Sequence, residues 1–228
     1  MGSASQTIFL ALAMLGAIGA PITAQAPVPD WASVAPVDVA DLVAGPHSTM
    51  EMLYERTIFR VDVLRLTIVL GAATTAGIEP MIAAHSYSNE LAASLAETAL
   101  EARDVLVRTR FLRNLTIRQF LDATAENLTA ARDGGLITDE ERHELLADME
   151  PAWEPFRARG ILAGDSTWYR IRGDRVDVVF LDAVDGSTPV NFTVVSPKHR
   201  RAVLGGYLTP SSDFREPLLR SLFSAALP

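Results

Sequence analysis

The sequence predicts an α+β fold, an open-faced β-sandwich in which a large antiparallel sheet is covered by a layer of helices. Three observations predict it. In the middle of the chain a strand-like stretch runs directly into one long, capped helix. Further on, three short alternating stretches separated by glycine-containing turns have the pattern of a β-meander. The helical stretches come in pairs between and after these strands, an order that suits helices packed on one face of a sheet.

Residues 111–135 are predicted to be the end of a strand followed by a long amphipathic helix. Thr116 and Gln119 fit a capping box, in which each side chain satisfies a free backbone N–H of the first turn. Apolar residues then recur at spacings of three and four, the helical period. Gly134 and Gly135 supply the left-handed residue with which such helices often end.

Phe120 and Asn127 lie seven residues apart on this helix and therefore share a face. A polar side chain on an otherwise apolar face needs an explanation. One explanation is that Asn127 hydrogen-bonds locally or lies at the edge of the apolar stripe. The other is that it faces a binding site.

The remaining elements follow from the periods of two and 3.6 residues. Asn89 is expected to cap one helix, and a second capping box, Thr138 with Glu141, opens another. The strand over 55–70 could also be two strands with a bend. In order, we expect a strand over 55–70, a weak helix over 71–84, a helix over 90–102, a strand over 105–112, the central helix, a helix from 138 to about 149, strands over 168–172, 175–181 and 190–195, and helices over 201–208 and 213–226.

Residues 1–26 are expected to be a signal peptide. Residues 7–20 form an apolar run that is too short for a comfortable bilayer span, and the first charged side chain is Asp30. An uncleaved anchor is the alternative. The protein is therefore expected to be periplasmic or secreted, with no membrane insertion after cleavage. The small residues after which cleavage is expected are Ala26, with Ala24 and Ala20 as alternatives.

Residues 27–49 contain four prolines and no sustained period, which predicts a linker or an extended arm. Trp31 could dock on the domain from this arm. Residues 50–228 are expected to form a single domain.

Composition excludes several classes of function. The formal net charge of −8 disfavours a general nucleic-acid binder, which needs a basic surface. The chain has no cysteine, so disulfides and thiolate metal sites are excluded, and its four histidines lack ligand spacing. No phosphate-binding or dinucleotide motif is present, and neither a metal nor a cofactor is expected. Asp182, Asp185 and Gly186 resemble half a calcium loop, but without a downstream glutamate they indicate a hairpin turn.

Among the arginines on or beside the predicted strands, five are candidates for a ligand contact, although most such side chains point to solvent. An arginine that points inward needs an anionic partner, because an unpaired buried charge is costly. A carboxylate ligand would serve as that partner. These arginines are Arg56, Arg60, Arg108, Arg110 and Arg113.

Three segments resemble the chalcone isomerase-like superfamily, and the likeness spans about residues 50–226. Residues 57–63 (TIFRVDV) are similar to the early strand of that fold. Residues 119–127 (QFLDATAEN) resemble the active-site helix of the plant enzymes, and residues 202–210 with 213–222 resemble the two C-terminal helices. The resemblance implies an open-faced β-sandwich with a ligand cleft between the sheet and the helices. Together with the expected signal peptide, it indicates an exported bacterial member of this fold.

The same resemblance argues against the flavonoid reaction. The helix asparagine is kept as Asn127, but Phe120 stands at the position of the tyrosine that donates to the developing enolate. Arg60 falls at the strand threonine, and Gly206 falls at the C-terminal serine or threonine. Arg56 is the nearest candidate for the strand arginine. No catalytic residue is assigned with certainty; Asn127 is the one candidate.

The leading hypothesis is a non-catalytic protein that binds a small amphipathic ligand, either fatty-acid-like or an aromatic acid. The alternatives are an isomerase or intramolecular lyase, whose donor would have to be Tyr54 or Tyr207, and a structural module whose cleft is filled by Tyr207, Leu208 and Phe59. The oligomeric state stays open. The residues expected to bind the ligand are Arg56, Arg60, Phe111, Phe120, Asn127, Gly206 and Tyr207.

Overall fold

The computed structural model describes residues 29–55 and 62–224. Within them, six strands form one antiparallel sheet in the order β1-β2-β3-β4-β5-β6, so each strand pairs with the next strand of the chain. The predicted α+β class with an antiparallel sheet is confirmed. The strands are β1 (Ser48–Glu55), β2 (Asp62–Leu70), β3 (Asp104–Phe111), β4 (Ser166–Arg172), β5 (Arg175–Leu181) and β6 (Val190–Val195).

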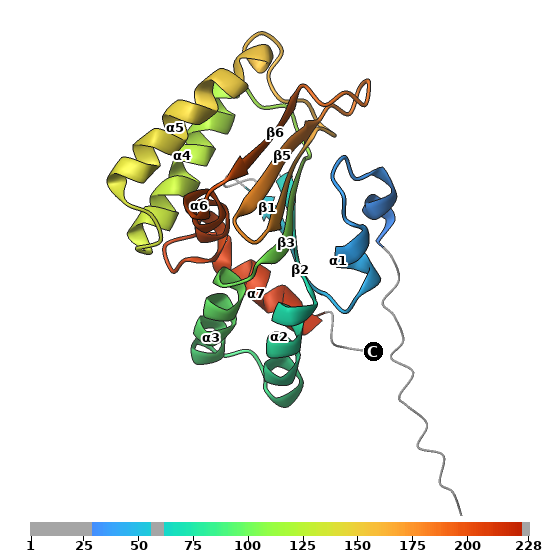
Figure 1. The fold of residues 1–228 in the computed structure, drawn as a ribbon, viewed down its shortest axis with the longest axis vertical. Helices are drawn as coiled ribbons and strands as arrows, with labels where there is room; N and C mark the ends of the chain where they lie inside the picture. Colours follow the sequence, from blue (N-terminus) through green and yellow to red (C-terminus); the bar gives the residue numbers. More distant parts are fainter. Residues whose placement is uncertain (1–28, 56–61, 225–228) are drawn as a thin grey trace, which may run out of the picture.

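Most of the helices lie on one side of this sheet, and the N-terminal segment lies on the other (Figure 1). On the helical side, α7 packs against β1 and α6 lies over β5, while α4 and α5 form an outer pair. The helices are η1 (Asp30–Val34), α1 (Ala40–Ala44), α2 (Ala72–Ala84), α3 (Asn89–Leu100), α4 (Ile117–Asp133), α5 (Asp139–Ala152), η2 (Glu154–Phe156), α6 (Pro197–Leu208) and α7 (Arg215–Ser224).

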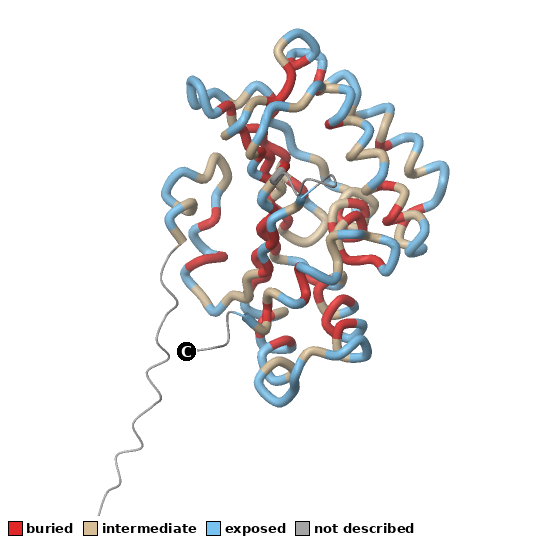
Figure 2. The backbone as a smooth tube through the Cα atoms, turned by 180° about the vertical axis from the view of Figure 1, so that it is seen from behind, coloured by how far each residue is buried: buried red, intermediate tan, exposed pale blue. Residues whose placement is uncertain are grey.

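Because side chains alternate along the strands, each face of the sheet contributes to its own apolar cluster. Toward the helices, Leu66, Ile68 and Val107 join the largest apolar cluster. On the opposite face, Leu106 and Trp168 join a smaller cluster that the N-terminal segment covers. Figure 2 shows the buried backbone concentrated along the strands and the helices next to them.

The two predicted capping boxes and the glycine end of α4 are confirmed, and one predicted cap is not. Capping boxes are present at Thr116 and at Thr138, and Gly135, just after α4, has a φ of 73°. The cap of α3 is displaced by one residue: the side chain of Ser88, rather than Asn89, accepts the hydrogen bond from the Leu91 N–H. Ser88 precedes the first helical residue, where its hydroxyl can reach a free amide.

The start of the sheet agrees with the prediction in part. Residues 62–70 of the expected strand form β2, whereas Glu55 ends an earlier strand, β1, which begins at Ser48 and pairs antiparallel with β2. Met50 and Met52 face the core on β1, but methionine carries little strand signal, so the alternation there was missed. Residues 56–61, between the two strands, lie outside the described residues.

The segment expected to be a linker contains η1 and α1 and packs on the sheet. Trp31 meets Trp168 edge-on at a ring-centroid distance of 5.9 Å, so the expected docking of Trp31 is confirmed. Val39 and Leu42 are buried in the same cluster.

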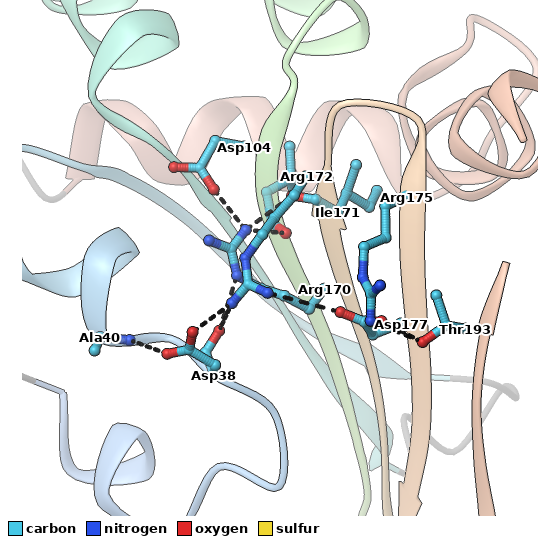
Figure 3. Close-up of polar contacts among 10 residues, drawn as sticks. Asp38, Ala40, Asp104, Arg170, Ile171, Arg172, Arg175, Asp177 and Thr193 are labelled. Carbon is cyan, nitrogen blue, oxygen red and sulfur yellow. Dashed lines mark hydrogen bonds and ion pairs between the residues drawn. The ribbon is translucent and has the colours of Figure 1, made fainter. Parts of the chain in front are cut away.

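A buried arginine fastens this segment to the sheet (Figure 3). Arg170 of β4 is 1% exposed; its Nε donates to the Asp38 carbonyl oxygen at 3.0 Å, and its Nη1 lies 2.5 Å from Asp104 Oδ1. Nη1 also donates to the carbonyl oxygens of Val105 and Ile171. These partners compensate a charge that would otherwise be costly to bury.

We expect Arg170→Met to lower the free energy of unfolding by about 3 kcal/mol, because it removes a buried guanidinium that pairs with the half-exposed Asp104 and leaves several buried carbonyl groups without their donor. Urea denaturation measures the change. Residues 29–47 should also become more sensitive to protease. The control is Arg175→Met on β5, whose exposed ion pair with Asp177 is worth roughly 0–1 kcal/mol. Equal losses in both variants would contradict the role given to Arg170.

On the helical side, α4 and α6 approach closely because α6 has no side chains at two consecutive positions. A Cβ on Gly205 would lie 2.7 Å from Leu136 Cδ1 and 2.9 Å from Ala131 Cβ. A Cβ on Gly206 would lie 3.0 Å from Asn127 Cβ and 3.1 Å from the Asn127 carbonyl oxygen. Glycine at these positions therefore sets the distance between the two helices.

We expect Gly205→Ala to destabilise the protein by about 1–3 kcal/mol, because overpacking outweighs the better helix propensity of alanine. Denaturant unfolding measures it. Gly77→Ala on α2 is the matched control, since a Cβ there would meet Thr98 Cγ2 at an ordinary 3.5 Å. That variant should be neutral or more stable by about 0.5–1 kcal/mol. A stabilised Gly205→Ala protein would show that the helices are not in close contact.

Candidate functional site

A cleft of about 540 Å³ lies between the sheet and helices α4 and α6. From the sheet it is lined by Thr109, Phe111 and Tyr169, which point to the helical side of β3 and β4. From the helices it is lined by Asn127 of α4 and Tyr207 of α6. The volume lies in the range of roughly 300–1,000 Å³ that is usual for small-molecule sites.

One wall of the cleft is aromatic. Phe120 lies edge-on to Phe111 at 5.9 Å between ring centroids, and its other side packs on Trp153 at 4.4 Å. Trp153 in turn contacts Phe156 and Phe180. Phe120 therefore belongs to a rigid apolar cluster, and its ring offers a ligand contact area but no hydrogen-bond donor.

Next to this wall, on the same strand and helix and on β4 and α6, the cleft holds a group of neutral hydrogen-bonding side chains. Burial raises the pKa of Tyr207, and a hydrogen bond with Thr109 offsets part of that rise. Burial also raises the pKa of Tyr169, with a further contribution from the nearby Tyr207. Asn127 is half-buried beside them, and its side chain makes no hydrogen bond with any residue in 29–55 or 62–224. The cleft thus presents uncharged donors and acceptors to whatever occupies it.

The structure brings together four of the seven predicted binding residues. Phe111, Phe120, Asn127 and Tyr207 all line the cleft. Gly206 does not; it faces Asn127 within the contact between α4 and α6. The two remaining predicted residues, Arg56 and Arg60, lie outside the described residues.

The other arginines divide between the two sides of the molecule. Arg108 and Arg110 lie on the face of the sheet away from the cleft, where the Arg108 guanidinium lies 4.8 Å from the centre of the Trp168 ring. Burial, with repulsion from Arg110 and Arg65, lowers the pKa of Arg108. Arg113, in the loop between β3 and α4, is exposed and lines the cleft at its rim. Of these three arginines, Arg113 is the one that can meet a ligand anion.

Thr109 and Tyr169 line the cleft but are not among the residues that the sequence predicted to bind a ligand. The alternation of β3 already puts Thr109 on the same face as Phe111, so a signal for it existed. Tyr169 gave no such signal, because only the register that pairs it with Val107 brings it beside Tyr207. Tyr54, suggested as a donor, also lines the cleft.

The alternative of a filled cleft named three side chains, of which two lie in the described residues. Tyr207 lines the cavity, and Leu208 is buried in the main core. Phe59 lies outside the described residues.

Neither a metal site nor a membrane span is found in the described part of the chain. No group of three or more histidine, cysteine, aspartate or glutamate side chains there could hold a metal ion. Asp182 and Asp185 accept hydrogen bonds from the backbone of Val184 and Ser187, which confirms the predicted hairpin turn. No helix of residues 29–55 and 62–224 is long and apolar enough to cross a bilayer.

The raised pKa values of Tyr169 and Tyr207 predict the behaviour of the protein in alkali. The phenols ionise near pH 10 in the unfolded chain but at higher pH in the folded protein. Their contribution to stability is therefore complete below about pH 10 and is lost as the pH rises through the folded values. In an ultraviolet titration, part of the phenolate absorbance should appear at a higher pH in the native protein than in the protein unfolded in urea. Tyr169→Phe should remove one of the phenols that ionise at raised pH. An unchanged titration curve would contradict the assignment of a raised pKa to Tyr169.

The fold of this chain is similar to that of a solved structure. No family model and no curated protein matches the chain. Among solved structures, the crystal structure of the Arabidopsis thaliana fatty-acid binding protein is similar, with a TM-score of 0.50 and 15% identity. The match covers 79% of this chain and 87% of that chain. The open six-stranded sheet with packed helices is of the chalcone isomerase-like type, as the sequence predicted.

Proposed function

We propose that this protein is an exported, non-catalytic binding protein for a small amphipathic ligand, which it holds in the cleft between sheet and helices. The observation that carries the proposal is a cleft in which an aromatic wall lies beside a cluster of neutral hydroxyl and amide groups. Such a lining matches a molecule with one apolar part and one polar part. The fatty-acid-binding function of the structural neighbour supports this class of ligand, and the apolar N-terminal run supports export.

A carboxylate is the polar group that best fits the hydrogen-bonding side chains of the cleft. Thr109 and Tyr207 hydrogen-bond to each other, which leaves one of the two hydroxyl protons for an acceptor on the ligand. Arg113 supplies a positive charge at the rim, where Asp122, Glu126 and Asp213 also lie. Hydrogen bonds to an ionised acceptor are about twice as strong as neutral ones.

An isomerase or intramolecular lyase is the second candidate, and the buried phenols favour it, since they could stabilise a developing enolate. Such chemistry also needs a general base within reach of the reacting carbon. The carboxylates that line this cleft, Asp122, Glu126 and Asp213, are exposed side chains at its rim. Phe120 stands where the related enzymes have a donor. Binding is therefore the better-supported function.

The experiment that tests the proposal is calorimetric titration of residues 27–228 with dodecanoic acid and with an aromatic acid such as cinnamic acid. We expect saturable binding of at least one of them. Arg113→Ala should weaken it about tenfold, the loss typical of a hydrogen bond to a charged group.

Arg110→Ala is the matched control. Arg110 is also exposed and lies three residues away, but on the other face of the sheet, so its removal changes the net charge equally without touching the cleft. Equal weakening in both variants would indicate only a general effect of charge. Failure of both acids to bind, together with native mass spectrometry of purified protein that shows no retained small molecule, would reject the binding function.

A further inference from the structure

A second cavity of about 410 Å³ adjoins the cleft on the side of α5. Its floor is the helical face of β5 and β6, where Val176, Val178, Phe192 and Val194 point into it. Its opposite side is formed by α4, α5 and α6, which contribute mainly apolar side chains. Those side chains are Leu128, Leu145, Met149, Ala202 and Val203, with Trp153 at the end of α5.

The two cavities adjoin at one place. Thr124, Asn127, Tyr169 and Tyr207 line both of them. These four side chains come from α4, β4 and α6, so three elements border the place where the cavities meet, which we call the passage. A ligand that occupies both cavities must pass through this passage with its polar group near the phenols and the amide.

The second cavity exposes apolar surface that the fold does not cover. Phe192 on the edge strand β6 is 37% exposed, and Val194 and Val203 are half-buried. The helix above them, α5, is mostly charged and buries one residue, Leu145. Exposed apolar side chains gathered around a cavity are typical of a binding surface.

The titratable residues of this cavity do not change its apolar character. Asp148 of α5 is exposed, and burial lowers the pKa of His199 on α6, with Lys198 acting in the same direction and Asp148 in the opposite one. At neutral pH the imidazole is therefore uncharged.

From this arrangement we infer that the second cavity is the compartment for the hydrocarbon tail of the ligand, whose polar head lies among Thr109, Tyr169 and Tyr207. The inference rests on the proposed function and narrows it to an unbranched aliphatic chain with one polar end. A flexible chain can bend through the passage beside Asn127, whereas a rigid aromatic ligand is confined to the first cavity. Affinity should therefore increase with chain length.

Trp153 provides a direct test, because it lines the second cavity while Trp31 and Trp168 pack on the far face of the sheet. Dodecanoic acid brominated at its terminal carbon should quench part of the tryptophan emission. The same acid brominated beside the carboxyl group should quench less, because bromine quenches over short distances only. Trp153→Phe should abolish the difference between the two probes.

Two neighbouring residues of β6 give a second, independent test by calorimetry. Val194→Phe fills the tail compartment, whereas Val195→Phe adds the same bulk to a side chain that is 74% exposed on the other face. Val194→Phe should weaken the binding of dodecanoic acid, by about tenfold for every two methylene groups of the ligand that the new ring excludes from the cavity. The binding of hexanoic acid, which has a shorter chain, should weaken much less. Val195→Phe should leave both affinities unchanged.

The outcomes separate this inference from the proposed function. If the acids bind but neither probe quenches Trp153, or the probe brominated beside the carboxyl group quenches more, the tail does not occupy the second cavity and the inference is overturned. Equal effects of Val194→Phe on both acids would also overturn it. If no acid binds at all, the proposed function itself fails.

Discussion

The close contact between α4 and α6 is the constraint on which the site depends. Because Gly205 and Gly206 have no side chains, α6 can lie directly against the backbone of α4 near Asn127 and Ala131. The next residue, Tyr207, then reaches the cleft beside Asn127. The contact is fixed at its end by Thr209, whose hydroxyl donates to the Ala130 carbonyl oxygen at 3.0 Å.

The two faces of the sheet serve different purposes. The face toward the N-terminal segment is closed by tryptophan packing and by the buried Arg170, and it offers a rigid support. The face toward the helices is closed by α7 at β1 but left open between β4–β6 and the α4–α5 pair. A small molecule can occupy that space without displacing any part of the core. This division is why we assign ligand binding to the helical face.

The sequence predicts most of the elements because their signals are local. The ends of α4 and α5 are set by side chains within three residues of each other, such as Thr116 with Gln119. The strand β1 was missed because its stability comes from pairing with β2 and from methionine packing, which leave little trace in the local pattern.

For the site, the helix face that carries Phe120 and Asn127 could be predicted, since it depends on one helical period. The contacts of Tyr207 with Thr109 and Tyr169 could not be predicted, because they form only when α6, β3 and β4 pack together. Gly206 illustrates the limit of reasoning by resemblance. By resemblance it is a position that has lost a hydrogen-bond donor, whereas in this molecule its missing side chain lets α4 and α6 approach each other closely.

The contact between the last helix and the first strand has a consequence for the order of assembly during synthesis. The Glu51 N–H on β1 donates to Ser221 Oγ on α7, 170 residues later, and Phe214 packs against Tyr54. At about 5–20 residues per second, a ribosome needs on the order of ten seconds to produce the chain between these partners. During that time the apolar face of β1, with Met50 and Met52, has contact with α2 but lacks the cover that α7 provides. The nascent protein therefore remains incompletely folded until α7 has been made.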